Sequence, residues 1–209
     1  MDKIRIISFA IFLTITLTYL FSCQNSEECI RYSHEVYLKE KVDTSILREA
    51  NEFHSTLLKW FKESSIKGQN HDVYHMIYFS AHMYGKSIKF ESIESKYYLS
   101  LKCLPKEDWH PKCENYKIEI EKEEWEKFEE MIYEFDFWTV NQFNERREVL
   151  DGVVYYLEGV RPEAKKCNKK TYRMIARGSP EFDKMGALCD YIRSYEDILA
   201  FRYKIRELE

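Results

Sequence analysis

Three charged residues in the second half of the chain have the types and spacing of a polar binding site. Glu158 lies in a run of β-forming residues, and Arg173 and Arg177 lie in the next such run. If the basic segment 162–170 is a hairpin loop, Glu158 lies close to Arg173 across two strands. A carboxylate and a guanidinium on an open sheet face would bind a polar ligand. The favoured alternative is an ordinary cross-strand ion pair, worth roughly a few tenths of a kcal/mol.

Histidines suggest a second kind of chemistry. His71 and His75 have the spacing that places two zinc ligands on one face of a helix. The segment 72–83 is rich in β-formers, however, and in a strand these two side chains lie roughly 13 Å apart. His82 would then point to the opposite face. We therefore expect no metal site, and no cofactor is indicated.

The sequence contains no motif of a known catalytic class. It lacks GxSxG, HExxH, the P-loop and GxGxxG. Serine, cysteine and histidine residues occur at no informative spacing, so no catalytic residue is assigned. The absence of motifs lowers the odds of an enzyme without excluding one, because many glycosidases show only scattered carboxylates.

The expected elements alternate between helices and strands. Apolar residues at helical spacing predict an amphipathic helix over 44–64, with His54 packed beside its apolar stripe. Period-two alternation predicts strands over 72–83, 87–93, 97–103 and 116–120. The later elements are a helix at 121–133, an aromatic strand at 135–140, a hairpin turned at Asp151-Gly152, a strand at 171–177, and helices beginning at Ser179-Pro180 and Ser194.

This pattern predicts an α+β fold in one globular domain, residues 43–209. We expect two layers, in which a mostly antiparallel sheet is packed by helices in the order ββα-ββα. The helix at 44–64 is an additional N-terminal element.

The N-terminus has the features of an export signal. Lys3 and Arg5 precede an apolar run that is too short for a comfortable membrane span. Leu20-Phe21-Ser22-Cys23 resembles the lipobox of bacterial lipoproteins, although Phe21 is bulkier than the usual residue there. The resemblance implies a signal peptide at 1–22, a lipid on Cys23 and a tether at 23–42. The alternatives are a cleaved signal without lipid or an uncleaved anchor.

The number of cysteines limits how many disulfide bonds can form within the chain. Six are present, and assigning Cys23 to lipid leaves an odd five, so one thiol stays unpaired within the chain. Cys29, in the tether, is the expected odd thiol. A bond between Cys103 and Cys113 would close a short loop and stabilise by about 3 kcal/mol. The possible disulfide residues are Cys103, Cys113, Cys167 and Cys189.

Several short motifs occur between about Tyr74 and Tyr195: MIYFSAH, Phe137-Trp138, Leu150-Asp151-Gly152, Leu157-Glu158-Gly159, Tyr172 and Arg177-Gly178-Ser179-Pro180. In these motifs the chain resembles a loosely defined family of small exported bacterial proteins. The position two before Leu157 is often Trp in that family and is Tyr155 here. The resemblance implies export and a similar fold, and it carries no mechanism.

The charge composition argues against one class of function, nucleic-acid binding. The chain has 209 residues, with 32 Lys and Arg against 36 Asp and Glu, a net charge of −4. This acidity argues against a nucleic-acid partner, which would require a basic face. We expect a protein attached through its lipid to the cell envelope, with the outer membrane favoured because Gln24 replaces the aspartate of inner-membrane retention. Its expected role is binding, as an inhibitor or immunity protein against an envelope or toxin protein. The alternative is an envelope hydrolase with a site on a polar sheet face or in a cleft.

Overall fold

The computed structural model describes residues 44–80, 84–104, 115–140, 142, 152–167, 169, 171–178 and 184–206. The signal at 1–22, the tether at 23–42 and its Cys23 lie outside these residues. The elements, in chain order, are α2 (Thr44–Trp60), β1 (Val73–Ser80), β2 (Gly85–Ile93), β3 (Lys96–Leu104), β4 (Tyr116–Ile120), α3 (Lys122–Glu134), β5 (Val153–Val160), the 3-10 helix η1 (Pro162–Cys167), β6 (Tyr172–Gly178) and α4 (Lys184–Arg206).

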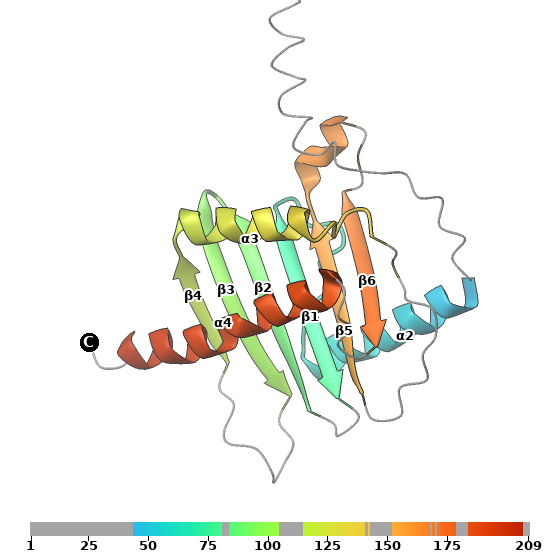
Figure 1. Cartoon of the computed structure of the whole chain (residues 1–209), viewed down its shortest axis with the longest axis horizontal. Coiled ribbons are helices and arrows are strands. Elements are labelled where there is room, and N and C mark those ends of the chain that lie inside the picture. The colour runs from blue at the N-terminus through green and yellow to red at the C-terminus, as the bar shows by residue number, and fades with distance from the viewer. Residues whose placement is uncertain are drawn as a thin grey trace, which may run out of the picture.

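The strands form one open sheet in the order β4-β3-β2-β1-β5-β6 (Figure 1). Every neighbouring pair is antiparallel. The α+β class, the antiparallel sheet and the N-terminal helix are as the sequence predicts. Four strands precede α3, at the four segments where alternation predicts them. Strand β1 lies at the centre, so the two halves of the chain meet along the pairing of β1 with β5.

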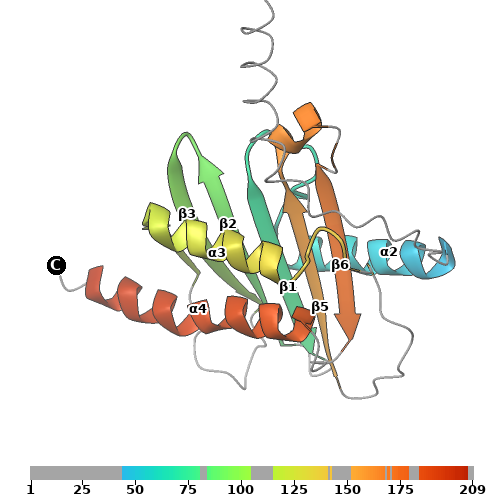
Figure 2. The ribbon, with the colours of Figure 1, turned by 45° about the horizontal axis from the view of Figure 1, so that its top comes forward.

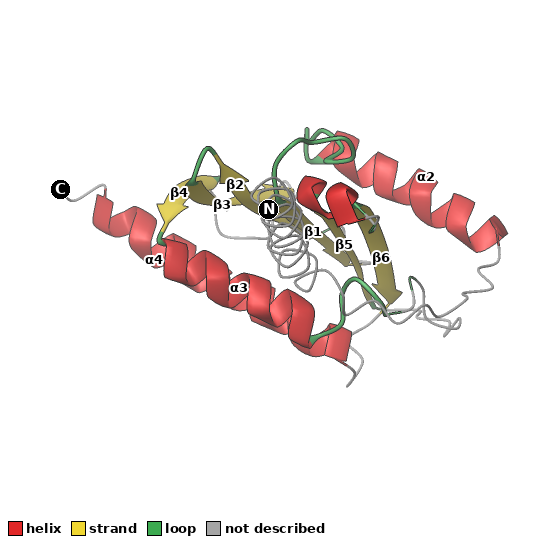
Figure 3. Cartoon of the chain, turned by 90° about the horizontal axis from the view of Figure 1, so that it is seen from above, coloured by secondary structure: helices red, strands yellow, loops and turns green. Residues whose placement is uncertain are grey.

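Helices cover the two faces of the sheet unequally. α3 and α4 run across one face (Figure 2), and α2 lies on the other (Figure 3). The first face holds the larger core, in which the rings of Phe90 and Phe128 stack 3.8 Å apart beside Tyr74. α3 contributes Trp125, Phe128 and Ile132 at the spacing that puts one stripe of a helix inward.

α2 covers only part of its face. Its Leu57 and Leu58, with Phe61 just after the helix, pack on apolar residues of β1, β5 and β6. In the described part of the chain no helix lies over the same face of β2, β3 and β4 (Figure 3). This unequal cover separates an apolar half of the face from a polar one.

Three expected elements differ in the structure. Residues 135–139 form turns rather than a strand, yet Phe137 and Trp138 are buried. α4 is one continuous helix, so Ser194 does not begin a second one; its hydroxyl donates to the Tyr191 carbonyl at 2.6 Å. Asp151 and Ser179-Pro180 lie outside the described residues, and β5, which begins after Gly152, pairs with β1 and β6.

The cysteines divide into bonded and free. Cys103 and Cys167 are each disulfide-bonded. They lie toward opposite ends of the sheet, because β3 brings Cys103 beside Lys86 while Cys167 follows Val160. Cys29 and Cys113 lie outside the described residues, so the predicted bond between Cys103 and Cys113 stays a prediction. Cys189 is buried and is not disulfide-bonded, which removes it from the possible disulfide residues.

None of the described helices combines the length and the apolar character that a membrane span requires.

Candidate functional site

The three charged residues singled out in the sequence lie on two faces of the sheet. In the pairing of β5 with β6, Glu158 lies opposite Met174, and Arg173 lies opposite Gly159. Residues that are one position apart in a strand point to opposite faces. Glu158 therefore faces α2, whereas Arg173 and Arg177 face the side of α3 and α4. The predicted pairing of Glu158 with Arg173 is wrong by one residue of register.

The two arginines hold the chain that follows α3. Arg173 donates to the carbonyl of Val140. Arg177 donates to the carbonyls of Gln142 and Ala176, each at 2.9 Å. The Ala176 amide also donates to the Gln142 carbonyl at 2.8 Å, next to these contacts. Buried at 2 % and 7 % exposure, the arginines thus attach residues 140–142 to β6 rather than offer a binding surface.

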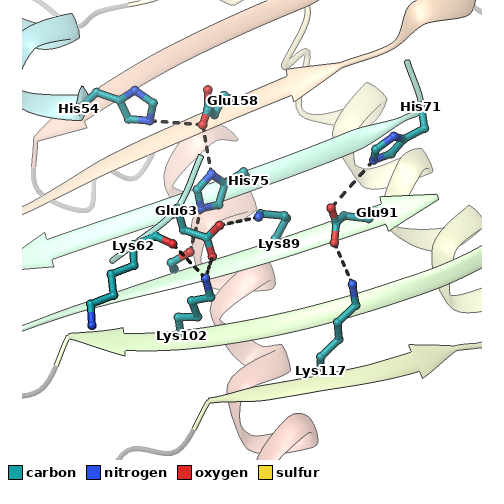
Figure 4. A network of polar contacts seen from close by, with 11 residues as sticks. His54, Lys62, Glu63, His71, His75, Lys89, Glu91, Lys102, Lys117 and Glu158 are labelled. Atoms are coloured by element: carbon teal, nitrogen blue, oxygen red, sulfur yellow. Dashed lines mark hydrogen bonds and ion pairs between the residues drawn. The ribbon is translucent and has the colours of Figure 1, made fainter. Parts of the chain in front are cut away.

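Glu158 instead lies at the centre of a buried polar group, which we call the Glu158 cluster: His54, His75, Glu158 and Tyr172. Figure 4 shows Glu158 between His54 and His75. Its Oε1 is 3.1 Å from Nδ1 of His75 and 3.3 Å from Nε2 of His54. The His54 contact has the distance of an ion pair but not the alignment of a hydrogen bond. The Tyr172 hydroxyl donates to Oε2 at 3.1 Å. Glu158 and His75 are completely buried.

Sheet register and helix packing bring this cluster together. His75 of β1 lies directly opposite Glu158 of β5, which places both side chains on the α2 face. His54 comes from α2, one turn before Leu57, which packs on the sheet. The sequence places His54 beside the apolar stripe, as the structure shows. It does not indicate that the partner of this histidine is a carboxylate more than 100 residues away.

The carboxylate of Glu158 is ionised. Burial alone would raise its pKa, but contacts from His54 and His75 outweigh burial and lower the pKa to about 2. An ionised carboxylate only accepts hydrogen bonds, so Nδ1 of His75 carries a proton toward it. Tyr172 likewise acts as a donor, since burial and the neighbouring Glu158 charge raise the pKa of its hydroxyl.

His75 makes a second contact with the neighbouring strand. Its Nε2 is 2.8 Å from the hydroxyl oxygen of Ser87 in β2. In a neutral His75 protonated on Nδ1, Nε2 is the acceptor of the Ser87 proton. Carboxylate, imidazole and hydroxyl thus follow the order of a serine catalytic triad. The sequence does not reveal this set, because its members come from three strands and match no local motif.

The Ser87 hydroxyl has little access to solvent. Ser87 is only 1 % exposed. Beside it lies a second polar group, the Glu63 cluster, in which Glu63 pairs with Lys89 at 2.7 Å and with Lys102 at 2.8 Å (Figure 4). Burial would raise the pKa of Glu63, but hydrogen bonds from Lys102 and Lys89 lower it. Glu63 follows α2, so the end of this helix is tied to β2 and β3.

Beyond the Glu63 cluster the sheet exposes polar side chains. We call them the open polar face; they occupy alternate positions of β2, β3 and β4, which the register places on the α2 side. Lys117 pairs with Glu91 at 3.4 Å and lies over the Tyr98 ring at 4.8 Å from its centroid. The members of this face are Glu91, Tyr98, Ser100, Lys117 and Glu119, all partly or fully exposed.

No metal centre is found in the part of the chain that the structure describes: no group of three or more His, Cys, Asp or Glu side chains is placed to hold an ion. His71 and His75 do not converge. His71 lies 3.9 Å from Glu91, whereas His75 belongs to the Glu158 cluster. His82 lies outside the described residues.

The fold and the two clusters define an α+β protein with an open antiparallel sheet, one buried carboxylate network and one partly uncovered polar face. Comparisons with protein-family models, with curated proteins and with solved structures found no match.

Proposed function

We propose that this chain is a lipid-anchored protein of the bacterial cell envelope that acts by binding another protein through the open polar face. The observation that carries the proposal is the unequal cover of the sheet. α2 covers the apolar half of its face, and the half over β2 to β4 carries charged, hydroxyl and aromatic side chains instead. A sheet face that is packed within its own domain is apolar, so alternating polar residues indicate a solvent-facing surface.

The composition of the open polar face favours a protein partner. Positive Lys117 alternates with negative Glu91 and Glu119, and Tyr98 supplies an aromatic surface. Complementary charges at an interface direct partner choice and association rate, and tyrosine is enriched at interfaces. An inhibitor or immunity protein that blocks an envelope toxin is one specific form of this role.

Binding through this face is tested by capturing proteins from envelope extracts with wild-type protein and two charge reversals. Lys117→Glu reverses a charge within the open polar face, and Lys127→Glu does so at an exposed position of α3 on the other side. We expect a partner that wild type and Lys127→Glu retain and that Lys117→Glu loses by about tenfold or more, because like charges then face each other. Equal retention by all three proteins, or by none, would contradict the proposal.

The anchor rests on the lipobox resemblance at Cys23. One acyl chain binds a membrane marginally, whereas two or three hold it stably. We expect labelled palmitate to enter the wild-type protein and not the Cys23→Ala variant, with the variant released from washed membranes. Incorporation into both proteins would exclude lipidation at Cys23.

A further inference from the structure

Ser87 is hydrogen-bonded to a histidine that in turn contacts a carboxylate, and a purely structural serine does not require these neighbours. Its hydroxyl lies 2.8 Å from Nε2 of His75, whose Nδ1 lies 3.1 Å from the ionised Glu158. The Tyr172 hydroxyl holds the second carboxylate oxygen. All three members of the series lie on neighbouring strands, β2, β1 and β5, and share one face. In this arrangement the imidazole of His75 can act as a general base on the Ser87 hydroxyl, and the Glu158 carboxylate orients the imidazole through its other nitrogen.

Two lysines are neighbours of Ser87 in the sheet, on the same face. Lys102 lies directly opposite Ser87 in the pairing of β2 with β3, and Lys89 is the next residue of β2 on that face. Both bind the carboxylate of Glu63, which is largely buried between them. The two lysines that hold the Glu63 carboxylate are thus register neighbours of Ser87. Glu63 therefore fills a site that suits an oxyanion.

We propose that Ser87, His75 and Glu158 form a serine esterase site for carboxylic esters, which the Glu63 cluster keeps closed. Ser87, His75 and Glu158 act as nucleophile, general base and orienting carboxylate, and Lys89 and Lys102 supply positive charge to the developing oxyanion. The activity is separate from the proposed binding function, which uses the open polar face.

The reaction proceeds in two balanced steps. Oγ of Ser87 attacks the ester carbonyl carbon while its proton passes to Nε2 of His75, and the carbonyl electron pair moves to oxygen. Collapse of this intermediate breaks the bond to the alkoxide leaving group, which takes the proton from His75. Water then attacks the acyl-serine by the same route and releases the acid and free Ser87.

Closure explains why the site is buried. Ser87 is 1 % exposed, and in the proposed mechanism the site opens when Glu63 leaves Lys89 and Lys102. Glu63 lies beyond the end of α2, next to Lys62, whose φ of 52° is in the left-handed region. The ion pairs of the Glu63 cluster tie this turn to β2 and β3, together with a hydrogen bond from Nζ of Lys102 to the Lys62 carbonyl at 3.4 Å. Neutralising Glu63 removes both ion pairs with a single substitution and therefore favours opening.

The test is covalent labelling of the full-length protein by an alkyl fluorophosphonate, which phosphonylates activated serines and releases fluoride. We expect Glu63→Gln to be labelled at least about tenfold faster than wild type, with the adduct on the peptide that contains Ser87. Adding Ser87→Ala should abolish this labelling. Adding Ser55→Ala should not, because Ser55 is an exposed residue of α2 whose hydroxyl donates to the Asn51 carbonyl at 2.7 Å, away from both proposed sites.

The folded state of each variant is checked by near-ultraviolet circular dichroism. If Glu63→Gln does not fold, wild-type protein is labelled in about 1 M NaCl, where screening weakens the same ion pairs. The absence of an adduct on Ser87 in the opened protein would overturn the proposal, and so would an adduct whose rate Ser87→Ala leaves unchanged. Hydrolysis of a nitrophenyl ester, measured on the same proteins, should follow the labelling.

Discussion

Replacing Glu158 by alanine is expected to destabilise the fold by about 3–5 kcal/mol, because removal of one partner from a buried charged group leaves the others uncompensated. His54, His75 and Tyr172 would lose the carboxylate to which their polar atoms are directed. The loss should be measured as the change in urea-unfolding free energy at neutral pH.

Two further variants separate this effect from a general loss of charge. Glu119→Ala removes a carboxylate that is 49 % exposed and 3.7 Å from Lys96, so its cost should stay below about 1 kcal/mol. Glu158→Gln keeps the shape and one acceptor oxygen, and its cost should fall between those of the two alanine variants. A cost of less than 1 kcal/mol for Glu158→Ala would show that the Glu158 cluster contributes little to stability.

Acid should remove the contribution of the same carboxylate over a defined pH range. The pKa of Glu158 is lowered from an ordinary 4.5 to about 2. A lowered carboxylate pKa means that the folded state binds its proton less readily than the unfolded state does. The stabilisation is therefore complete above pH 4.5 and is lost as the pH falls toward 2; it amounts to about 3 kcal/mol.

The measurement is urea unfolding of wild type and Glu158→Gln at a series of pH values from 6 to about 2.5. Wild-type stability should decline below pH 4.5 more steeply than that of the variant. Part of the decline should remain in Glu158→Gln, because the pKa of Glu63 is also lowered, by Lys102 and Lys89. Parallel curves for the two proteins would contradict the assignment of this acid sensitivity to Glu158.

The two polar clusters of the α2 face differ in how close they lie to the solvent-exposed surface. The Glu158 cluster is completely buried at His75 and Glu158, so by itself it stabilises the packing of α2. The Glu63 cluster borders both Ser87 and the open polar face through Lys89 and Lys102. The proposed binding function and the proposed esterase activity can therefore be tested separately, by changing Lys117 for the first and Ser87 for the second.

Local patterns in the sequence were sufficient for most of the elements. The spacing of Trp125, Phe128 and Ile132 predicts a helix, and α3 is found there because one apolar stripe buries against the sheet. Alternation of apolar and polar residues in the segments 87–93 and 97–103 predicts strands, and β2 and β3 are found there because every second side chain packs against the core. The aromatic segment 135–140 is different: Phe137 and Trp138 are buried from turns, because burial of a ring does not require a strand.

The site depended on information that no local pattern contains. Glu158 meets His75 across 83 positions of sequence, and Arg173 is separated from Glu158 by one step of strand register. Side chains alternate between the two faces of a sheet, so a shift of one residue in register places a side chain on the opposite face, among different neighbours. The periodicity of apolar residues was therefore enough to predict the α+β class and the positions of most helices and strands. It could not predict which side chains meet, because strand order and register depend on contacts between distant segments.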